Sequence, residues 1–252
     1  MSNPGHTRST RQATHLLQTP DTFVRTAMPG LDGGMVIVHA SPALGAKFLQ
    51  YTAELKPGGI LAGAQHQRFL YVVYGEAAIT LEDENYTEGS PQTHILRPGS
   101  FAYFPPSVLA TLTAYSTLML AVIEKRYQPV HGIHQHPPIF GHEDDIRPQA
   151  LNEDPDICVR SLLPATLEFD FAVNTMTYSH GAALPQVEIH VMEHGCLMLE
   201  GHGPYRLGDK TYPVQAGDFI WMAPFCPQWF QAEGPLPAKY LIYKDWNRVP
   251  PL

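Results

Sequence analysis

Potential metal ligands gather in one short segment of the second half of the sequence. Glu188, His190 and His194 lie within seven residues of one another. Alternate side chains of a β-strand point to opposite faces, so a strand over 187–199 is predicted to turn these three side chains the same way. One carboxylate and two imidazoles form the 2-His-1-carboxylate pattern of first-row metal ions. A carboxylate facing a β core without a partner costs several kcal/mol, so we expect a cation beside Glu188.

A fourth ligand is predicted further along the chain. Gln228 begins a segment expected to run as a strand beside the first. Its amide oxygen would complete a set of four donors, and an octahedral ion would keep two positions for water or substrate. His180 and His202 flank the ligand segment near turns, and we expect both at the surface.

The elements that must position these side chains are mainly strands. The 252 residues include 24 prolines and 20 glycines, a number of chain breakers that disfavours a helical bundle. A short helix is expected only around residues 156–163. The segments rich in β-branched or aromatic residues, which we predict as strands, are 48–55, 69–81, 110–123, 171–178, 187–199, 218–222 and 239–243.

Two blocks of the sequence occur twice in the same order. Residues 68–75 match 194–201, and each of these two segments is a strand that ends at a turn glycine. Residues 98–106 match 216–224, and each of these begins with a glycine turn and continues as a strand that ends at proline. The spacing between the blocks differs by eight residues, which we assign to a longer hairpin in the first half with its turn at 82–84. The pattern indicates a duplicated antiparallel β unit, and therefore an all-β fold.

The duplication predicts the domain organisation. We expect an N-terminal arm at 1–34, a first β unit at 35–127, a linker at 128–150 and a second β unit at 151–252. The linker is rich in proline, glycine and histidine. Its histidines are interpreted as part of an extended connector, since no rigid scaffold would fix them as ligands; they are His131, His134, His136 and His142.

The first unit lacks the donors of the second. Alignment on the turn glycines puts Ala62, Ala64 and Arg68 at the positions of Glu188, His190 and His194, and Ala110 at the position of Gln228. No ligand is retained, so the first unit is predicted to hold no metal and to act as a scaffold.

Composition excludes several classes of partner. The chain has 16 Lys and Arg against 24 Asp and Glu, a net charge of −8, which argues against a nucleic-acid partner. No run of about 18 apolar residues predicts a membrane span. The first thirty residues lack a signal-peptide core, and three cysteines without a C-x-x-C pair fit a reducing compartment. We therefore expect a cytoplasmic protein with no membrane or nucleic-acid partner.

The spacing of the ligands resembles the two motifs of the cupin superfamily. The pattern is Gly181-x6-Glu188-x-His190-x3-His194-x6-Gly201, followed by Gly217-x6-Pro224-x3-Gln228. The usual cupin order has His where Glu188 stands and Glu where His194 stands, and the second motif usually ends in His rather than Gln. This departure makes oxalate oxidase or decarboxylase chemistry less expected.

The chain is similar to one bicupin family in particular, the (S)-ureidoglycine aminohydrolases. The similar segments are residues 69–73, 103–107, 125–130, 188–194 and 240–248. The resemblance implies two antiparallel jelly-roll β-barrels and an Mn²⁺ ion held by Glu188, His190, His194 and Gln228. It also implies that Tyr240 and Lys244 contact the substrate, because that family has a Tyr and a Lys at these spacings after the Gln ligand.

The resemblance further implies an activity: hydrolysis of (S)-ureidoglycine to (S)-ureidoglycolate and ammonia, in the degradation of purines through allantoin. Lys244 would pair with the substrate carboxylate. Glu188 would exchange protons as the amine leaves and water enters. The partner is then a small ureido carboxylate, with Glu188, Tyr240 and Lys244 as catalytic residues and Gln228 also touching substrate.

Other functions remain open at this point. The same ligand set with iron would suit a cupin dioxygenase, and a non-catalytic cupin would bind a small carboxylate or sugar. Other divalent first-row ions would also fit the mixed N/O donors. The face opposite the ligands is also apolar, so the strand needs cover on both faces, and we expect a homo-oligomer. The apolar residues of that face are Val187, Ile189, Val191, Leu197 and Leu199.

Overall fold

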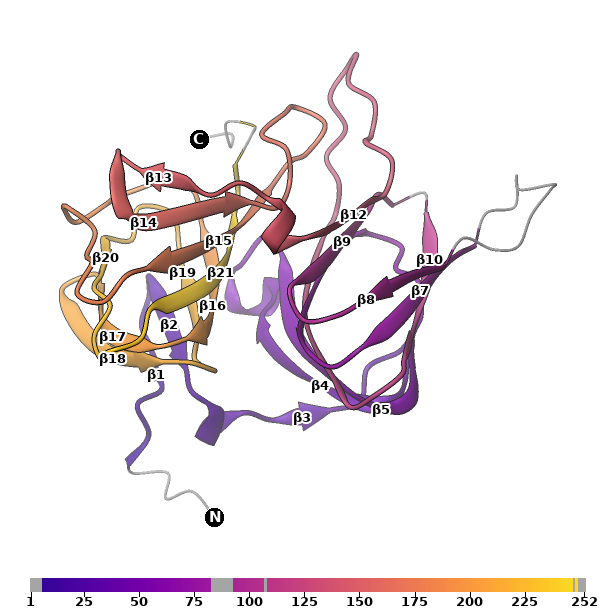
Figure 1. Cartoon of the computed structure of the whole chain (residues 1–252), viewed down its shortest axis with the longest axis horizontal. Helices are drawn as coiled ribbons and strands as arrows, with labels where there is room; N and C mark the ends of the chain where they lie inside the picture. The colour runs from indigo at the N-terminus through magenta and orange to yellow at the C-terminus, as the bar shows by residue number, and fades with distance from the viewer. Residues whose placement is uncertain (1–5, 83–92, 107, 247, 249–252) are drawn as a thin grey trace. The chain divides into compact units, whose positions relative to one another are not determined.

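The structure is a computed structural model that describes residues 6–82, 93–106, 108–246 and 248. The turn expected at 82–84 therefore falls largely outside the described residues. The chain divides into two compact units, Val24–Asp145 and a second made of Met1–Phe23 with Ile146–Leu252. Both are antiparallel β structures, so the all-β prediction is confirmed (Figure 1). The described helices are three short 3-10 turns, η2 Pro20–Thr22, η3 Pro42–Leu44 and η4 Glu143–Asp145.

The first unit is built on a sheet in the order β12-β9-β6-β11-β5-β10-β7-β8, with β4 added on β5 and β3 on β4. Its strands are β3 Arg25–Thr26, β4 Leu31–Ala40, β5 Leu49–Leu61, β6 Gln67–Tyr74, β7 Ala77–Glu82, β8 Thr93–Leu96, β9 Ser100–Phe104, β10 Leu109–Ala114, β11 Leu118–Lys125 and β12 Ile139–His142. Alternation is clear in β10, where Ala110, Leu112 and Ala114 enter the core.

The second unit has an eight-stranded sheet in the order β1-β2-β19-β16-β21-β15-β14-β13 and a three-stranded sheet in the order β18-β17-β20. Its strands are β1 Thr10–Arg11, β2 His15–Gln18, β13 Gln149–Leu151, β14 Asp154–Ser161, β15 Ala172–Tyr178, β16 His194–Glu200, β17 His202–Leu207, β18 Lys210–Gln215, β19 Phe219–Met222, β20 Gln228–Phe230 and β21 Ala238–Lys244. Its core includes Tyr178, Tyr205 and Tyr240, all almost fully buried.

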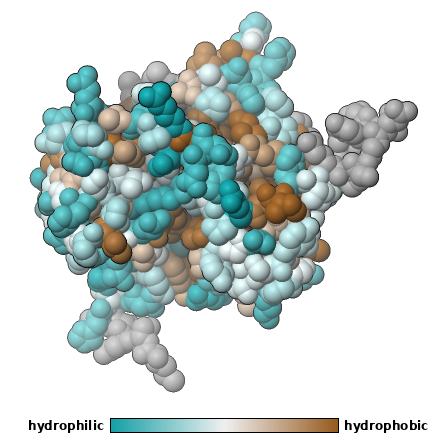
Figure 2. All heavy atoms as spheres, in the orientation of Figure 1, coloured by the Kyte–Doolittle hydropathy of each residue, from teal (hydrophilic) through white to brown (hydrophobic). Residues whose placement is uncertain are grey.

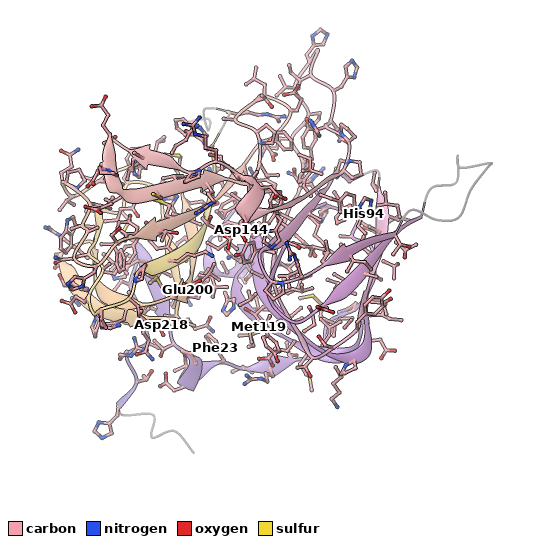
Figure 3. The ribbon with its side chains drawn as sticks, viewed as in Figure 1. Phe23, His94, Met119, Asp144, Glu200 and Asp218 are labelled. Carbon is pink, nitrogen blue, oxygen red and sulfur yellow. The ribbon has the colours of Figure 1, made fainter. Side chains whose placement is uncertain are left out.

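The N-terminal residues belong to the second unit. Strand β2 pairs with β19, so the indigo start of the chain lies among orange and yellow strands in Figure 1. Arg8 forms a bidentate ion pair with the fully buried Asp218 at 2.5 and 2.9 Å. Figure 3 shows Asp218 close to the N-terminal ribbon. The units divide after Phe23, whereas the arm was expected to extend to residue 34.

Strand pairing follows the sequence duplication. Arg68 pairs with Phe104 on one side and Glu124 on the other. At the matching place in the second unit, His194 pairs with Met222 and Lys244. The alignment that placed Arg68 on His194 is thus reproduced by the strand register of the two units.

Several expected elements differ from the structure. The helix predicted around 156–163 is wrong: these residues belong largely to β14, which pairs with β15 and buries Ile157. Part of the expected linker is also ordered in sheets, since β12 pairs with β9 and β13 with β14. In both places tertiary strand pairing overrides local chain signals.

The predicted strand over 187–199 is correct only from His194 onward. Residues 187–193 are irregular apart from a single bridge at Glu188. The alternation argument for three ligands on one strand face is therefore wrong, although the same side chains still meet, as described next.

Candidate metal centre

Glu188 and Gln228 are brought together by their own backbones. They form an isolated antiparallel bridge in which each N–H donates to the other's carbonyl, at 2.8 and 2.9 Å. Residues opposite each other in an antiparallel pair project their side chains to the same face. Two residues distant in sequence thus present a carboxylate and an amide side by side, from an irregular segment and the start of β20.

The two histidines complete this cluster. His190 Nε2 lies 3.1 Å from Glu188 Oε2, and the His190 carbonyl accepts a hydrogen bond from the Phe225 N–H. His194 begins β16, and its ring centroid is 5.5 Å from that of His190 in an edge-on arrangement. All four predicted ligands line one cavity, so the structure brings them together.

The surroundings of His194 are suited to a metal ligand. The side chain is buried, and neither ring nitrogen makes a hydrogen bond within the described residues. Burial lowers the pKa of His194 to about 3, and the nearby charges of Lys244 and His190 act in the same direction. A buried neutral imidazole with free nitrogens costs desolvation energy that a bound metal ion would recover.

Lys244 faces the same cavity from β21, directly opposite His194 in the strand ladder. Burial lowers its pKa, while the charge of Glu188 opposes the shift. The side-chain oxygen of Asn174 accepts a hydrogen bond from Lys244 Nζ, 3.2 Å away, and the side-chain nitrogen donates to the Val173 carbonyl. Asn174 therefore helps to hold the ammonium of Lys244 at the cavity, near the charge of Glu188.

Buried tyrosines form the wall behind these groups. Tyr205 donates from its hydroxyl to Gln228 Oε1 at 3.3 Å, and the hydroxyls of Tyr240 and Tyr178 are 2.7 Å apart. Burial raises the pKa of all three phenols, so they act as neutral hydrogen-bonding groups. Tyr240 lines the cavity, as the sequence analysis expected of a substrate contact.

Sequence reasoning missed Tyr205, Tyr178 and Asn174. Asn174 and Tyr178 lie on β15 at the same alternation as Met176, which lines the cavity. The strand was predicted at 171–178, so its even-numbered residues were identifiable as neighbours of the site. Tyr205 carries no comparable signal, because only the pairing of β17 with β20 brings it to Gln228.

The cavity is small and mixed in character, with a volume of about 120 Å³. Its lining combines the four predicted ligands, Tyr240 and Lys244 with five apolar side chains, those of Leu151, Met176, Leu184, Met192 and Ile242. Such a cavity suits a small polar molecule whose charged groups are fixed by a few side chains.

The donor set fits a divalent metal ion. Two imidazoles, a carboxylate and an amide oxygen are ligands that Mn²⁺ and its neighbours accept. Among the described residues, no three His, Cys, Asp or Glu side chains already stand at the spacing of a formed metal site. His190 and Glu188 hydrogen-bond directly instead, a contact that a shared cation would replace. His180 and His202 are exposed, as expected.

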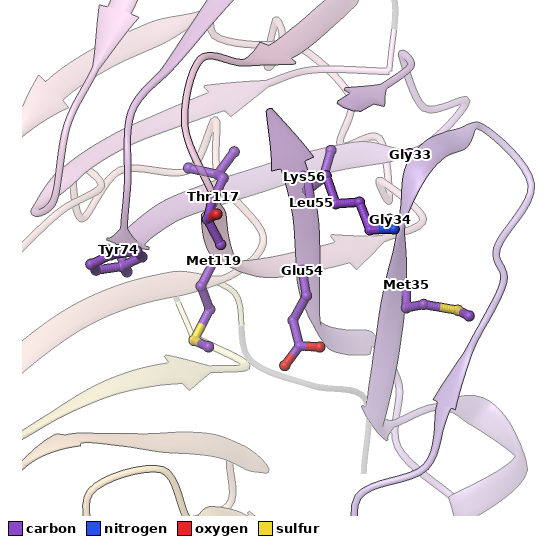
Figure 4. A pocket seen from close by; sticks show the side chains of 10 residues that line it. Gly33, Gly34, Met35, Glu54, Leu55, Lys56, Tyr74, Thr117 and Met119 are labelled. Atoms are coloured by element: carbon purple, nitrogen blue, oxygen red, sulfur yellow. The ribbon is translucent and has the colours of Figure 1, made fainter. Parts of the chain in front are cut away.

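A second cavity, of about 560 Å³, lies in the first unit (Figure 4). Its lining from β4, β5, β6 and β11 is mostly apolar, and its carboxylate, Glu54, is bound to Arg25 at 2.6 Å. Its lining among the described residues also includes Lys56, Tyr74 and Thr117 but no histidine, and so it lacks the imidazole and carboxylate cluster of the second unit. The site of chemical interest is therefore the smaller cavity of the second unit.

The comparisons with known proteins show the family of the chain. A cupin domain model matches residues 174–243, and an EutQ-like cupin domain model matches residues 43–127. The (S)-ureidoglycine aminohydrolase of Arabidopsis thaliana is 39% identical over 98% of this chain and 80% of the relative. The probable (S)-ureidoglycine aminohydrolase of Oryza sativa subsp. japonica is 36% identical over 98% of this chain and 78% of the relative. The chain belongs to the (S)-ureidoglycine aminohydrolase family.

Solved structures of other proteins share the fold of this chain. A putative glyoxylate-induced protein from Pseudomonas aeruginosa matches with a TM-score of 0.87 and 30% identity, over 98% of this chain and 93% of that one. Bacillus subtilis oxalate decarboxylase, which has Mn(II) centers, matches with a TM-score of 0.73 at 12% identity, over 96% of this chain and 80% of that one. The second likeness concerns the fold alone.

Proposed function

We propose that this protein hydrolyses (S)-ureidoglycine to (S)-ureidoglycolate and ammonia, with Mn²⁺ as its metal ion. The observation that supports this most is one cavity that combines a Glu-His-His-Gln donor set with a lysine and a tyrosine. The relatives named above carry the same activity in their names. Hydrolysis breaks the bond from carbon to the amine nitrogen, forms a bond to a water oxygen and releases ammonia.

Different side chains of the cavity bind different groups of the substrate. The substrate carboxylate pairs with Lys244 Nζ, which supplies a cation in a low-dielectric cavity. The Tyr240 hydroxyl hydrogen-bonds a second substrate oxygen. Two fixed contacts plus the ligand cluster hold the carbon in one orientation, so only one hand of the substrate fits.

Proton transfer is assigned to Glu188. The attacking water must lose a proton and the departing amine must gain one. Glu188 is the carboxylate that lines the cavity, and its Oε2 accepts a hydrogen bond from His190 Nε2. A bound divalent ion would supply Lewis acidity at the same place.

The decisive experiment measures product identity as well as rate. Purified protein loaded with Mn²⁺ is given (S)-ureidoglycine, and ammonia and the enantiomers of ureidoglycolate are followed. We expect ammonia well above the uncatalysed rate and an excess of the S product. Ammonia at the background rate with racemic product would remove the proposal. Iron in the isolated protein with oxygen consumption would instead support a dioxygenase, and metal binding without turnover a non-catalytic carboxylate-binding cupin.

We also propose that the protein works as a homo-oligomer in the cytoplasm. Val187 and Ile189, beside the site, are 36% and 60% exposed, and the described part of the chain has further exposed apolar side chains, including Met35 and Tyr74. The face seen in Figure 2 carries brown apolar patches between hydrophilic areas. Among the described residues no helix is long and apolar enough to cross a membrane. Light scattering that gives the mass of a monomer would contradict the oligomer.

A further inference from the structure

The hydroxyl of Tyr178 is enclosed where water cannot reach it. Tyr178 has no exposed surface and does not line the cavity, whereas Tyr240 does. The two hydroxyl oxygens are 2.7 Å apart and form a hydrogen bond with each other. Among the described residues, neither hydroxyl has another hydrogen-bond partner. The ring of Tyr178 is held in addition by Phe230, at a centroid distance of 5.0 Å.

The single hydrogen bond between the two hydroxyls has two possible directions, and they are not equivalent. If Tyr240 donates to Tyr178, the proton of Tyr178 is left buried without an acceptor, a loss of about 1–3 kcal/mol. If Tyr178 donates to Tyr240, the proton of Tyr240 is free to point into the cavity, where water or substrate accepts it. The second arrangement satisfies both donors.

We infer that Tyr178 is a positioning residue that donates to the Tyr240 oxygen and thereby turns the Tyr240 proton toward the substrate. The cavity group bonded by Tyr240 must then be an acceptor: a carboxylate or ureido carbonyl oxygen rather than an ammonium or amide N–H. This assignment of an acceptor rests on the proposed function, but the direction of the hydrogen bond does not.

The direction is tested on the full-length protein by NMR of tyrosine labelled at the ring carbon that bears the hydroxyl. We expect the Tyr178 hydroxyl proton to exchange slowly with solvent and the Tyr240 hydroxyl proton to exchange rapidly. Tyr178→Phe and Tyr240→Phe assign the two signals. A slowly exchanging Tyr240 proton beside a rapidly exchanging Tyr178 proton would overturn the inference. This measurement needs neither metal nor substrate.

A kinetic cycle tests the consequence for catalysis. Tyr178→Phe is expected to raise KM and lower kcat/KM roughly 3–10-fold, the loss of one oriented hydrogen bond. In a Tyr240→Phe background the same change should alter kcat/KM less than about twofold, because Tyr178 acts through Tyr240. Equal effects in both backgrounds would indicate a structural role and contradict the inference.

The matched control is Tyr103→Phe, which removes another buried tyrosine hydroxyl, bonded to Gln67 in the first unit at 3.1 Å. It should leave kcat/KM unchanged. If wild-type protein does not turn over ureidoglycine, the proposed function fails, and the exchange measurement alone still decides whether Tyr178 donates.

Discussion

The two barrels carry opposite chemistry at equivalent positions of the strand ladder. In the second barrel His194 faces Lys244 across β16 and β21, and in the first Arg68 faces Glu124 across β6 and β11. Arg68 pairs with Glu124 at 2.8 Å and donates to the Ala62 carbonyl at 2.6 Å. Ala62 occupies the position of Glu188 in the duplicated alignment.

The difference shows how a duplicated barrel loses a metal site without losing its fold. In the first barrel a guanidinium supplies the positive charge, and the cavity beside it has no room for a water molecule. Tyr51 donates to Glu124 at 2.8 Å, so the carboxylate is satisfied internally. In the second barrel neither ring nitrogen of His194 has a hydrogen-bond partner among the described residues, and the cavity of about 120 Å³ has room for a small ligand.

The largest effect on activity should come from removing a candidate metal ligand from the cavity of the second barrel. His194→Ala deletes the most buried predicted ligand, and we expect metal content after dialysis to fall close to zero and turnover to fall by a factor of about 10³ or more. Elemental analysis and ammonia release are the measurements. His202→Ala, an exposed histidine of the same unit, is the control. Full metal retention in the His194 variant would disprove its role as a ligand.

Breaking the ion pair between Arg68 and Glu124 in the first barrel should lower stability and leave activity unchanged. Arg68→Ala leaves Glu124 largely buried without its cation, and we expect the free energy of unfolding to fall by about 2–4 kcal/mol. Urea unfolding followed by fluorescence measures this loss.

The control for this change is Arg25→Ala, which breaks the more exposed pair with Glu54 in the same barrel and should cost less than about 1 kcal/mol. The double variant Arg68→Met with Glu124→Leu should recover much of the stability, since it removes both charges. If the double variant loses as much stability as Arg68→Ala, apolar side chains cannot replace the ion pair, and the pair itself stabilises the barrel.

Lys244→Met tests the charge that distinguishes the second cavity. It removes the expected partner of the substrate carboxylate, and kcat/KM should fall roughly 10–100-fold, mainly through KM. Steady-state kinetics with Mn²⁺-loaded protein measures the change. Lys210→Met, on β18 and exposed, should leave both parameters unaltered. An unchanged KM in the Lys244 variant would place the carboxylate elsewhere.

The smallest effect concerns a buried imidazole that has a partner. His39 in the first barrel shares a hydrogen bond with Thr52 at 2.8 Å, and burial lowers its pKa to about 3. As pH falls below about 6.5 the unfolded chain binds a proton that the folded chain refuses, so stability declines from there toward pH 3.

His39→Gln should reduce this decline by about 1 kcal/mol between pH 7.5 and 5.5, measured by urea unfolding at each pH. His131→Gln, at an exposed residue, should leave the pH dependence of unfolding as it is in the wild type. An unaltered decline in the His39 variant would mean that other groups cause it.

The sequence by itself was sufficient for the all-β class, the duplication and the choice of four candidate ligands that line one cavity. Residue type and the turn glycines carried this information, because alternating apolar residues and paired motifs are local features. The alignment of the two halves of the sequence also predicted correctly that Arg68 occupies the place of His194 in the strand ladder.

Tertiary structure alone decided how the ligands meet. Glu188 reaches the others through a backbone bridge with Gln228, a contact across forty residues, and not through a continuous strand. The same applies to Tyr205 against Gln228 and Tyr178 against Tyr240, which only strand pairing brings together. Long-range pairings of this kind depend on where backbone hydrogen bonds find partners, and no local pattern in the chain specifies that.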